Sequence, residues 1–189
     1  MSILRGNAVI GQSGGPTAAI NATLSGVIRG AFAAKDAIPT VYGMRNGIEG
    51  FLAENLINLT EAFANEDDLK ILEQTPAAAL GSCRKKMKSP EVEPETYERL
   101  IEIFKKYDIR YFFYIGGNDS MDTVSKLSAF AKNHDYEMRV IGVPKTIDND
   151  LMVTDHTPGF GSAAKFVATT IKEFIRDISV YTVKAVTIV

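Results

Sequence analysis

The chain has 189 residues, of which 46% are hydrophobic and 23% are charged, and it contains one cysteine. This length suits one domain with a sizeable core, and the composition is that of an ordinary globular protein. The net charge of −2 argues against nucleic-acid binding, and the lone Cys83 excludes an intrachain disulfide and a cysteine-rich zinc site. Because no secretory leader or run of about 18 apolar residues occurs, we expect a cytoplasmic protein without a membrane partner.

Short apolar runs alternate with longer amphipathic stretches along the chain. The runs predict strands, because they have strand length and bulky or β-branched content, at residues 7–11, 38–43, 111–117, 139–144 and 184–189. A period of 3.6 residues predicts helices around residues 20–32, 95–107, 124–131 and 166–178. For residues 44–93 we expect only short helices and loops.

The predicted strands are apolar along their whole length, which is typical of a parallel sheet buried on both faces by helices. We therefore predict an α/β fold, a Rossmann-like three-layer sandwich with a mainly parallel sheet, in a single domain over residues 1–189. Ligands of such sheets bind beyond the carboxyl ends of the strands. The loops after the strands at 7–11, 111–117 and 139–144 should therefore meet at one edge.

Two of these loops are rich in glycine and lead into predicted helices: GQSGGPT (11–17) and GGNDS (116–120). Gly14 and Gly15 let backbone N–H groups approach a ligand, and a helix offers its positive N-terminal end to an anion. Taken alone, the first loop fits a plain turn as well as a phosphate cradle, and the second fits a helix cap better. Two such turns at one sheet edge favour a phosphate site.

Two further stretches carry charge. GSCRKKMK (81–88) is most simply a solvated surface, but beside a phosphate-binding edge its cations would form a clamp. In PKTIDND (144–150), a turn rich in Asp and Asn explains every polar residue except Lys145. Phosphoryl transfer needs a base, a metal ligand and a cation, and this stretch contains all three. We therefore favour phosphoryl transfer for it.

Together, SGG (13–15), GSCR (81–84), GGNDS (116–120) and TIDND (146–150) resemble the phosphofructokinase family in order and spacing, and DHTPGFGSA (155–163) continues the match. ATP-dependent members typically have glycine at the positions of Asp119 and Lys145. Both differences indicate the branch that uses pyrophosphate. The Asp119 carboxylate would repel the ATP α-phosphate, and Lys145 would stabilise charge on the transferred phosphoryl group.

The resemblance implies a phosphotransferase that moves a phosphoryl group reversibly from pyrophosphate to the 1-hydroxyl of fructose 6-phosphate in glycolysis, with Mg²⁺ as cofactor. It implies a catalytic set with Asp148 as general base, together with Lys145, Asp119 and Arg84. The donor-binding residues would be Gly14, Gly15, Arg84, Gly117, Asp119, Ser120 and Lys145. Thr146, Ile147 and Asp148 would contact the sugar phosphate, and Asn118 and Asp150 would hold the metal. Asn118 departs from the family's usual acidic residue, and an amide is a weaker ligand for a hard cation.

The chain stops at Val189, before the family's Met-Gly-Arg motif and its second α/β domain. The resemblance therefore predicts an N-terminal donor-binding domain without its substrate domain, poorly active alone, from a protein that forms a homodimer or homotetramer. Two alternatives stay open. An ATP-dependent member that tolerates Asp119 would bind Mg-ATP, whereas a non-catalytic regulatory homologue would not need Asp148 and Lys145.

Overall fold

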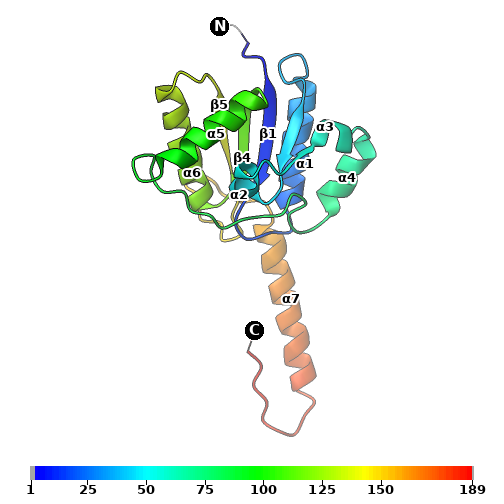
Figure 1. The fold of residues 1–189 in the computed structure, drawn as a ribbon. Helices are drawn as coiled ribbons and strands as arrows, with labels where there is room; N and C mark the ends of the chain where they lie inside the picture. Colours follow the sequence, from blue (N-terminus) through cyan, green and yellow to red (C-terminus); the bar gives the residue numbers. More distant parts are fainter. Residues whose placement is uncertain (1–2, 189) are drawn as a thin grey trace. The chain divides into compact units, whose positions relative to one another are not determined.

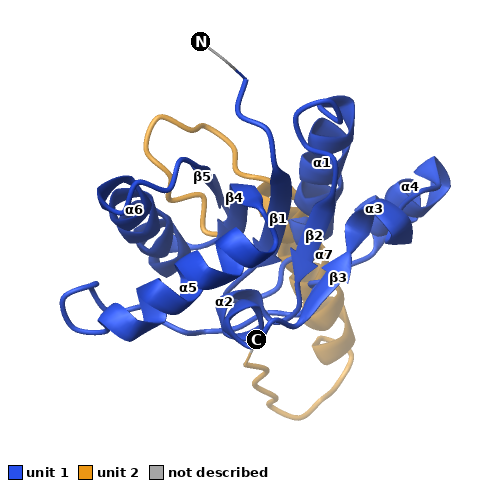
Figure 2. Cartoon of the chain, turned by 45° about the horizontal axis from the view of Figure 1, so that its top comes forward, with its two compact units in different colours: residues 1–145 blue, residues 146–189 orange. Residues whose placement is uncertain are grey.

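The computed structural model describes residues 3–188 and divides the chain into two compact units, Met1–Lys145 and Thr146–Val189 (Figure 2). The first unit contains every strand of the described residues. The second unit contains one long helix.

The first unit is built on a five-stranded sheet in the order β3-β2-β1-β4-β5 (Figure 1). Strands β1 (Asn7–Gln12), β2 (Val41–Met44), β4 (Ile109–Gly116) and β5 (Arg139–Pro144) are parallel to one another. Only β3 (Leu56–Asn58) is antiparallel, paired with β2. The predicted α/β class with a mainly parallel sheet is therefore confirmed. Strand β3 was not predicted, since three partly buried residues make too short a run to be recognised.

Helices cover both faces of this sheet (Figure 1). The helices of the first unit are α1 (Ile20–Ala33), α2 (Gly47–Leu52), α3 (Leu59–Ala62), α4 (Glu66–Gln74), α5 (Pro94–Lys106) and α6 (Asn118–Asn133). Side chains alternate along the central strand β1: Ala8 and Ile10 pack with α1, α3 and α4, whereas Val9 packs with α2, α5 and α6. All three side chains are fully buried, so the predicted three layers are confirmed.

The outer strand β5 departs from the predicted burial. Its side chains are exposed or only partly buried, and Ile141 is 40% exposed. An edge strand has a neighbour on one side only, here β4. Burial on both faces, predicted from its apolar run, is therefore wrong for β5.

The second unit contains α7 (Phe160–Ile178), which confirms the helix predicted around residues 166–178. The helix is amphipathic, yet none of its residues is buried, and Phe166 is 71% exposed. The strand predicted at 184–189 is wrong for residues 184–188, which form no strand, and Val189 lies outside the described residues. A strand needs a neighbour for its backbone hydrogen bonds, and residues 146–188 contain no strand with which these residues could pair. No helix between residues 3 and 188 is long and apolar enough to cross a membrane.

A cluster of charges joins the end of α2 to α5. Glu54 follows α2, and its carboxylate accepts hydrogen bonds from Arg99 Nη2 at 2.6 Å and from the Tyr107 hydroxyl at 3.0 Å. It also pairs with Lys106. The contact with Lys106 first, and then those with Tyr107 and Arg99, lower the pKa of the Glu54 carboxyl to about 2.

Replacing this carboxylate should destabilise the fold at neutral pH and matter little in strong acid. Because the folded-state pKa of about 2 lies below the ordinary 4.5, the Glu54 contribution is complete above pH 4.5 and is lost as the pH falls toward 2. Thermal unfolding midpoints of the parent and Glu54→Gln, measured from pH 7 to pH 2, should therefore converge. Glu102→Gln removes a 67% exposed carboxylate that pairs with Arg99 alone, and it should change the midpoint less. Identical pH curves for the two variants would contradict the assignment.

Candidate active site

The carboxyl ends of β1, β4 and β5 border a cavity of about 630 Å³. It is lined by Ser13, Gly14, Gly15, Cys83, Arg84, Lys85, Gly117, Asn118, Asp119, Ser120 and Lys145. The structure thus brings together all seven residues that the sequence suggested for donor binding, and Asn118 with them. Ser13 and Cys83 were not singled out individually, although both lie inside the motifs SGG and GSCR.

The loop after β1 forms one wall and requires glycine. Gly14 has a φ of +79°, a left-handed conformation that side chains other than glycine rarely adopt, and a Cβ there would lie 3.3 Å from Lys145 Nζ. Lys145 Nζ donates a hydrogen bond to the carbonyl oxygen of Gly15 at 2.5 Å. The backbone N–H of Lys145 donates to the carbonyl oxygen of Gly116 at 2.8 Å. Lys145 therefore connects the loop that follows β1 to the end of β4.

The N-terminus of α6 forms the second wall. The interpretation of Asn118, Asp119 and Ser120 as a side-chain cap is wrong. The N-cap residue is Gly117, which has no side chain to accept a hydrogen bond from the first turn of α6. The first N–H groups of a helix have no acceptor within it, and here they lie beside the cavity that these residues line. A Cβ on Gly116 would lie 2.1 Å from Ser120 Oγ, so glycine lets the helix start directly after the strand.

The GSCR loop forms the third wall and is bonded to the loop after β1. The carbonyl oxygen of Cys83 accepts from the Gly14 N–H at 3.0 Å and from Ser13 Oγ at 3.4 Å. Ser82 Oγ donates in return to the carbonyl oxygen of Gly14 at 2.5 Å. Beneath the loop, Cys83 Sγ lies 3.7 Å from the buried hydroxyl of Tyr114. Burial raises the pKa of that tyrosine, so its hydroxyl stays protonated.

The basic run at 84–88 divides into two parts. Arg84 and Lys85 line the cavity, whereas Lys86 pairs with Asp119 at 3.2 Å and Lys88 pairs with Glu93 outside it at 3.1 Å. The expectation of a solvated surface thus fits only part of the run. With Lys145, the cavity carries three cations and one carboxylate, and such a balance favours an anion.

The remaining predicted residues, Thr146, Ile147, Asp148 and Asp150, belong to the second unit. There, Thr146 Oγ1 accepts from the Asp148 N–H at 3.0 Å.

The asparagine of TIDND shapes the loop of this unit. The Asn149 side chain donates to the Asp155 carbonyl oxygen at 3.0 Å and accepts from the Thr157 N–H at 2.8 Å. The turn interpretation of TIDND therefore holds for Asn149. It leaves Asp148 and Asp150 as exposed carboxylates.

The side chains of the first unit fit a magnesium ion only together with a phosphate ligand. Among residues 3–188, no group of three or more His, Cys, Asp or Glu side chains is placed to hold a metal. Mg²⁺ commonly takes one or two carboxylates and completes its shell with phosphate oxygens and water. In the cavity the one carboxylate is Asp119, which is paired with Lys86, and Asn118 adds a neutral amide oxygen.

The model of the family described as phosphofructokinase matches residues 7–189. The chain belongs to the phosphofructokinase family. It is 51% identical over 174 residues to the pyrophosphate–fructose 6-phosphate 1-phosphotransferase of Xanthomonas campestris pv. campestris, covering 92% of this chain and 40% of that protein. The protein of the same name from Halomonas elongata is 49% identical, with 92% and 41% covered.

Solved structures of the family agree with the fold. The crystal structure of a pyrophosphate-dependent phosphofructokinase from Marinobacter aquaeolei matches with a TM-score of 0.81 at 50% identity, covering 92% of this chain and 42% of that one. The chain therefore spans about two fifths of the length of these relatives. The family resemblance expected from the four motifs is confirmed.

Proposed function

We propose that this chain supplies the pyrophosphate-binding site of a pyrophosphate-dependent 6-phosphofructokinase. The complete enzyme would transfer a phosphoryl group reversibly from pyrophosphate to the 1-hydroxyl of fructose 6-phosphate, giving fructose 1,6-bisphosphate. The observation that carries the proposal is the cavity at the sheet edge, where Arg84, Lys85 and Lys145 lie with the α6 N-terminus. The relatives at about 50% identity, which are named for this reaction, support the choice of donor and acceptor.

The first unit would bind and polarise the donor. Backbone N–H groups of Gly15 and of the first turn of α6 would take phosphate oxygens, because helix N-termini and glycine loops favour anions. Arg84 can bridge two oxygens with its planar fork, whereas Lys145 acts as a compact charge. In phosphoryl transfer, catalysis is mostly positioning and neutralisation of charge on the moving group, and these cations would provide it.

The second unit would act on the acceptor. Thr146 and Ile147 would contact fructose 6-phosphate, and Asp148 would take the proton from its 1-hydroxyl as the hydroxyl oxygen attacks phosphorus. The exposed carboxylate of Asp148 supports this role, since a base must reach the substrate. In the first unit, Asn118 would hold Mg²⁺ with phosphate oxygens, and the ion would neutralise charge on the donor when bound.

Donor binding is the direct test of the proposal. Calorimetric titration of the chain with Mg²⁺ and pyrophosphate should give binding at least tenfold tighter than titration with Mg²⁺ and ATP. Lys145→Met should weaken pyrophosphate binding by about tenfold or more, since a hydrogen bond to a charged group is worth about 1.5–3 kcal/mol. Lys88→Met removes a cation outside the cavity and should leave the affinity within about twofold. Tighter binding of ATP would overturn the choice of donor.

The rejection of ATP should depend on Asp119. Asp119→Gly removes a carboxylate from the cavity wall and should raise the affinity for Mg-ATP, because charge repulsion and bulk next to the α-phosphate disappear. The matched control is Asp122→Gly, in the same helix, which removes the partner of Lys126 and does not line the cavity. An unchanged ratio of ATP to pyrophosphate affinity in Asp119→Gly would refute this role.

Turnover should depend on Asp148 as the general base. In the complete protein, Asp148→Asn should lower kcat by about 10²-fold or more and leave pyrophosphate binding intact. Asp155→Asn, an exposed carboxylate of the same unit, should keep kcat within about twofold. A kcat for Asp148→Asn within a few-fold of the parent would disprove the assignment and favour another base.

A further inference from the structure

Arg84 reaches the cavity from the segment without helix or strand between α4 and α5, residues 75–93, whose first part, residues 75–84, is here called the arginine loop. The loop begins directly after α4 and runs past the end of β1. Because an irregular segment lacks a ladder of backbone hydrogen bonds, its position depends on bonds to other parts of the chain. The residues that supply these bonds therefore decide where the Arg84 guanidinium lies.

Two buried amides supply side-chain bonds to the first half of the arginine loop, beside one backbone bond from the Asn46 N–H to the Leu80 carbonyl oxygen at 2.8 Å. Gln12 ends β1 and Asn21 lies in the first turn of α1, and both side chains are fully buried. Asn21 Nδ2 donates to the Thr75 carbonyl oxygen, and Asn21 Oδ1 accepts from the Ala79 N–H, each at 2.9 Å. Gln12 Oε1 accepts from the Leu80 N–H at 2.9 Å. Gln12 Nε2 donates to Asn21 Oδ1 at 3.0 Å, which joins the two amides.

The backbone of the loop fixes which way both amides face. The Leu80 N–H can only donate, so Gln12 must turn its oxygen to it and its Nε2 to Asn21. Turning Asn21 over would set its oxygen against the Thr75 carbonyl oxygen. Any other orientation therefore leaves buried donors facing donors or acceptors facing acceptors, which costs the desolvation of each group. All these hydrogen bonds can therefore form together only when the loop lies in the position seen here.

The second half of the loop carries this position to the cavity. After Leu80, Ser82 and the carbonyl oxygen of Cys83 bond to the loop that follows β1, and Arg84 comes next. Without the amide pair, the N–H of the buried Leu80 would lose its acceptor, and the N–H of the exposed Ala79 would turn to water, so the loop would have to move.

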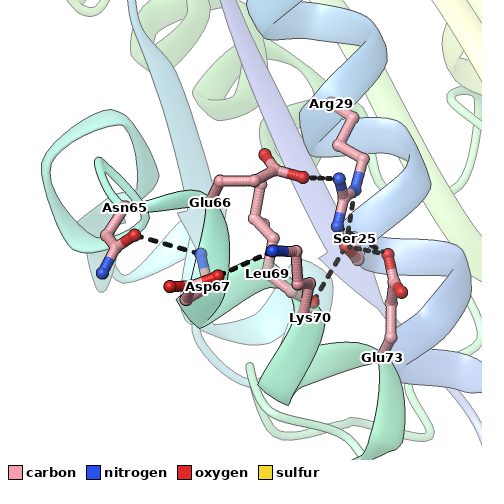
Figure 3. Close-up of polar contacts among 8 residues, drawn as sticks. All are labelled: Ser25, Arg29, Asn65, Glu66, Asp67, Leu69, Lys70 and Glu73. Atoms are coloured by element: carbon pink, nitrogen blue, oxygen red, sulfur yellow. Dashed lines mark hydrogen bonds and ion pairs between the residues drawn. The ribbon is translucent and has the colours of Figure 1, made fainter.

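A contact nearby on α1 fixes α4 but not the loop (Figure 3). Arg29 pairs with Glu73 at 2.8 Å and also with Glu66, and Ser25 Oγ donates to the carbonyl oxygen of Leu69 at 3.2 Å. All these partners lie in α4, before the arginine loop starts. A variant at this contact should therefore loosen α4 without changing the bonds that place Arg84, which makes it a control.

We infer that Gln12 and Asn21 are positioning residues of the donor site, which hold the arginine loop so that Arg84 meets the bound pyrophosphate. The inference rests on the proposed function, because Arg84 needs a phosphate partner in the cavity. Neither amide lines the cavity, so their effect passes through the loop. Loss of either amide should thus weaken the binding of pyrophosphate and leave the binding of fructose 6-phosphate unchanged.

The test uses the complete protein and the near-isosteric variants Gln12→Met and Asn21→Leu. Each should raise KM for pyrophosphate about tenfold or more, keep KM for fructose 6-phosphate within about twofold, and speed amide hydrogen exchange at Leu80 or Ala79. In an Arg84→Met background, Gln12→Met should add less than about twofold, because both changes act on one contact. Arg29→Met, the control, should lower the unfolding midpoint and leave KM for pyrophosphate within about twofold.

The outcomes separate the two claims. A parent protein that does not use pyrophosphate would overturn the proposed function and the inference with it. Faster exchange at Leu80 with an unchanged KM for pyrophosphate, or full additivity with Arg84→Met, would overturn the positioning role alone. If neither isosteric variant folds, Gln12→Asn keeps a neutral amide at this buried position but shortens it by one methylene, so that it cannot reach Leu80 and Asn21 together, and the same ratio of KM values then decides.

Discussion

The register of the parallel strands is the constraint on which the site depends. Gln12 lies beside Ile115, and Gly116 lies beside Pro144, so β1, β4 and β5 end at nearly the same level. Parallel strands direct all three following loops to one edge. A shift by one residue would turn the side chains of a strand to the opposite face, and the apolar residues of β1 and β4 could then not stay buried. Hydrophobic burial therefore fixes the level at which the glycine loops and Lys145 begin.

At this edge, the fold uses backbone and amide groups where charge would be costly. Gln12 and Asn21 are fully buried, and neutral amides there satisfy the backbone groups of the arginine loop without the penalty of a buried ion. The ionic groups stay nearer to solvent, for Arg84 and Asp119 are both exposed. Neutral buried groups thus hold the backbone of the loop, while the Arg84 guanidinium stays hydrated and can exchange its water for an anionic ligand.

Local patterns were sufficient for the parts of the fold that repeat. The apolar runs located four of the five strands and the 3.6-residue period located α1, α5, α6 and α7, because burial imposes those periods. The pattern could not reveal partners. It placed a strand at 184–189, where residues 184–188 form no strand, and it did not reveal that β5 is an edge. The short β3 depends on pairing with β2 and carries no signal of its own.

The site shows the same division between local and distant information. Motif residues can be recognised in the sequence by their unusual composition. The cavity is lined by such residues from the loops after β1 and β4, from the GSCR loop and from Lys145. Gln12 and Asn21 cannot be recognised in this way, because an amide beside a glycine turn or in a first helical turn is ordinary. Their importance lies in bonds to residues 54 to 68 positions away, such as Thr75 and Leu80. Likewise, only the structure divides Lys86 and Lys88 from Arg84, since their ion pairs with Asp119 and Glu93 depend on where α6 and α5 begin. A motif therefore identifies groups that meet a ligand, whereas the groups that aim them are found only in the folded contacts.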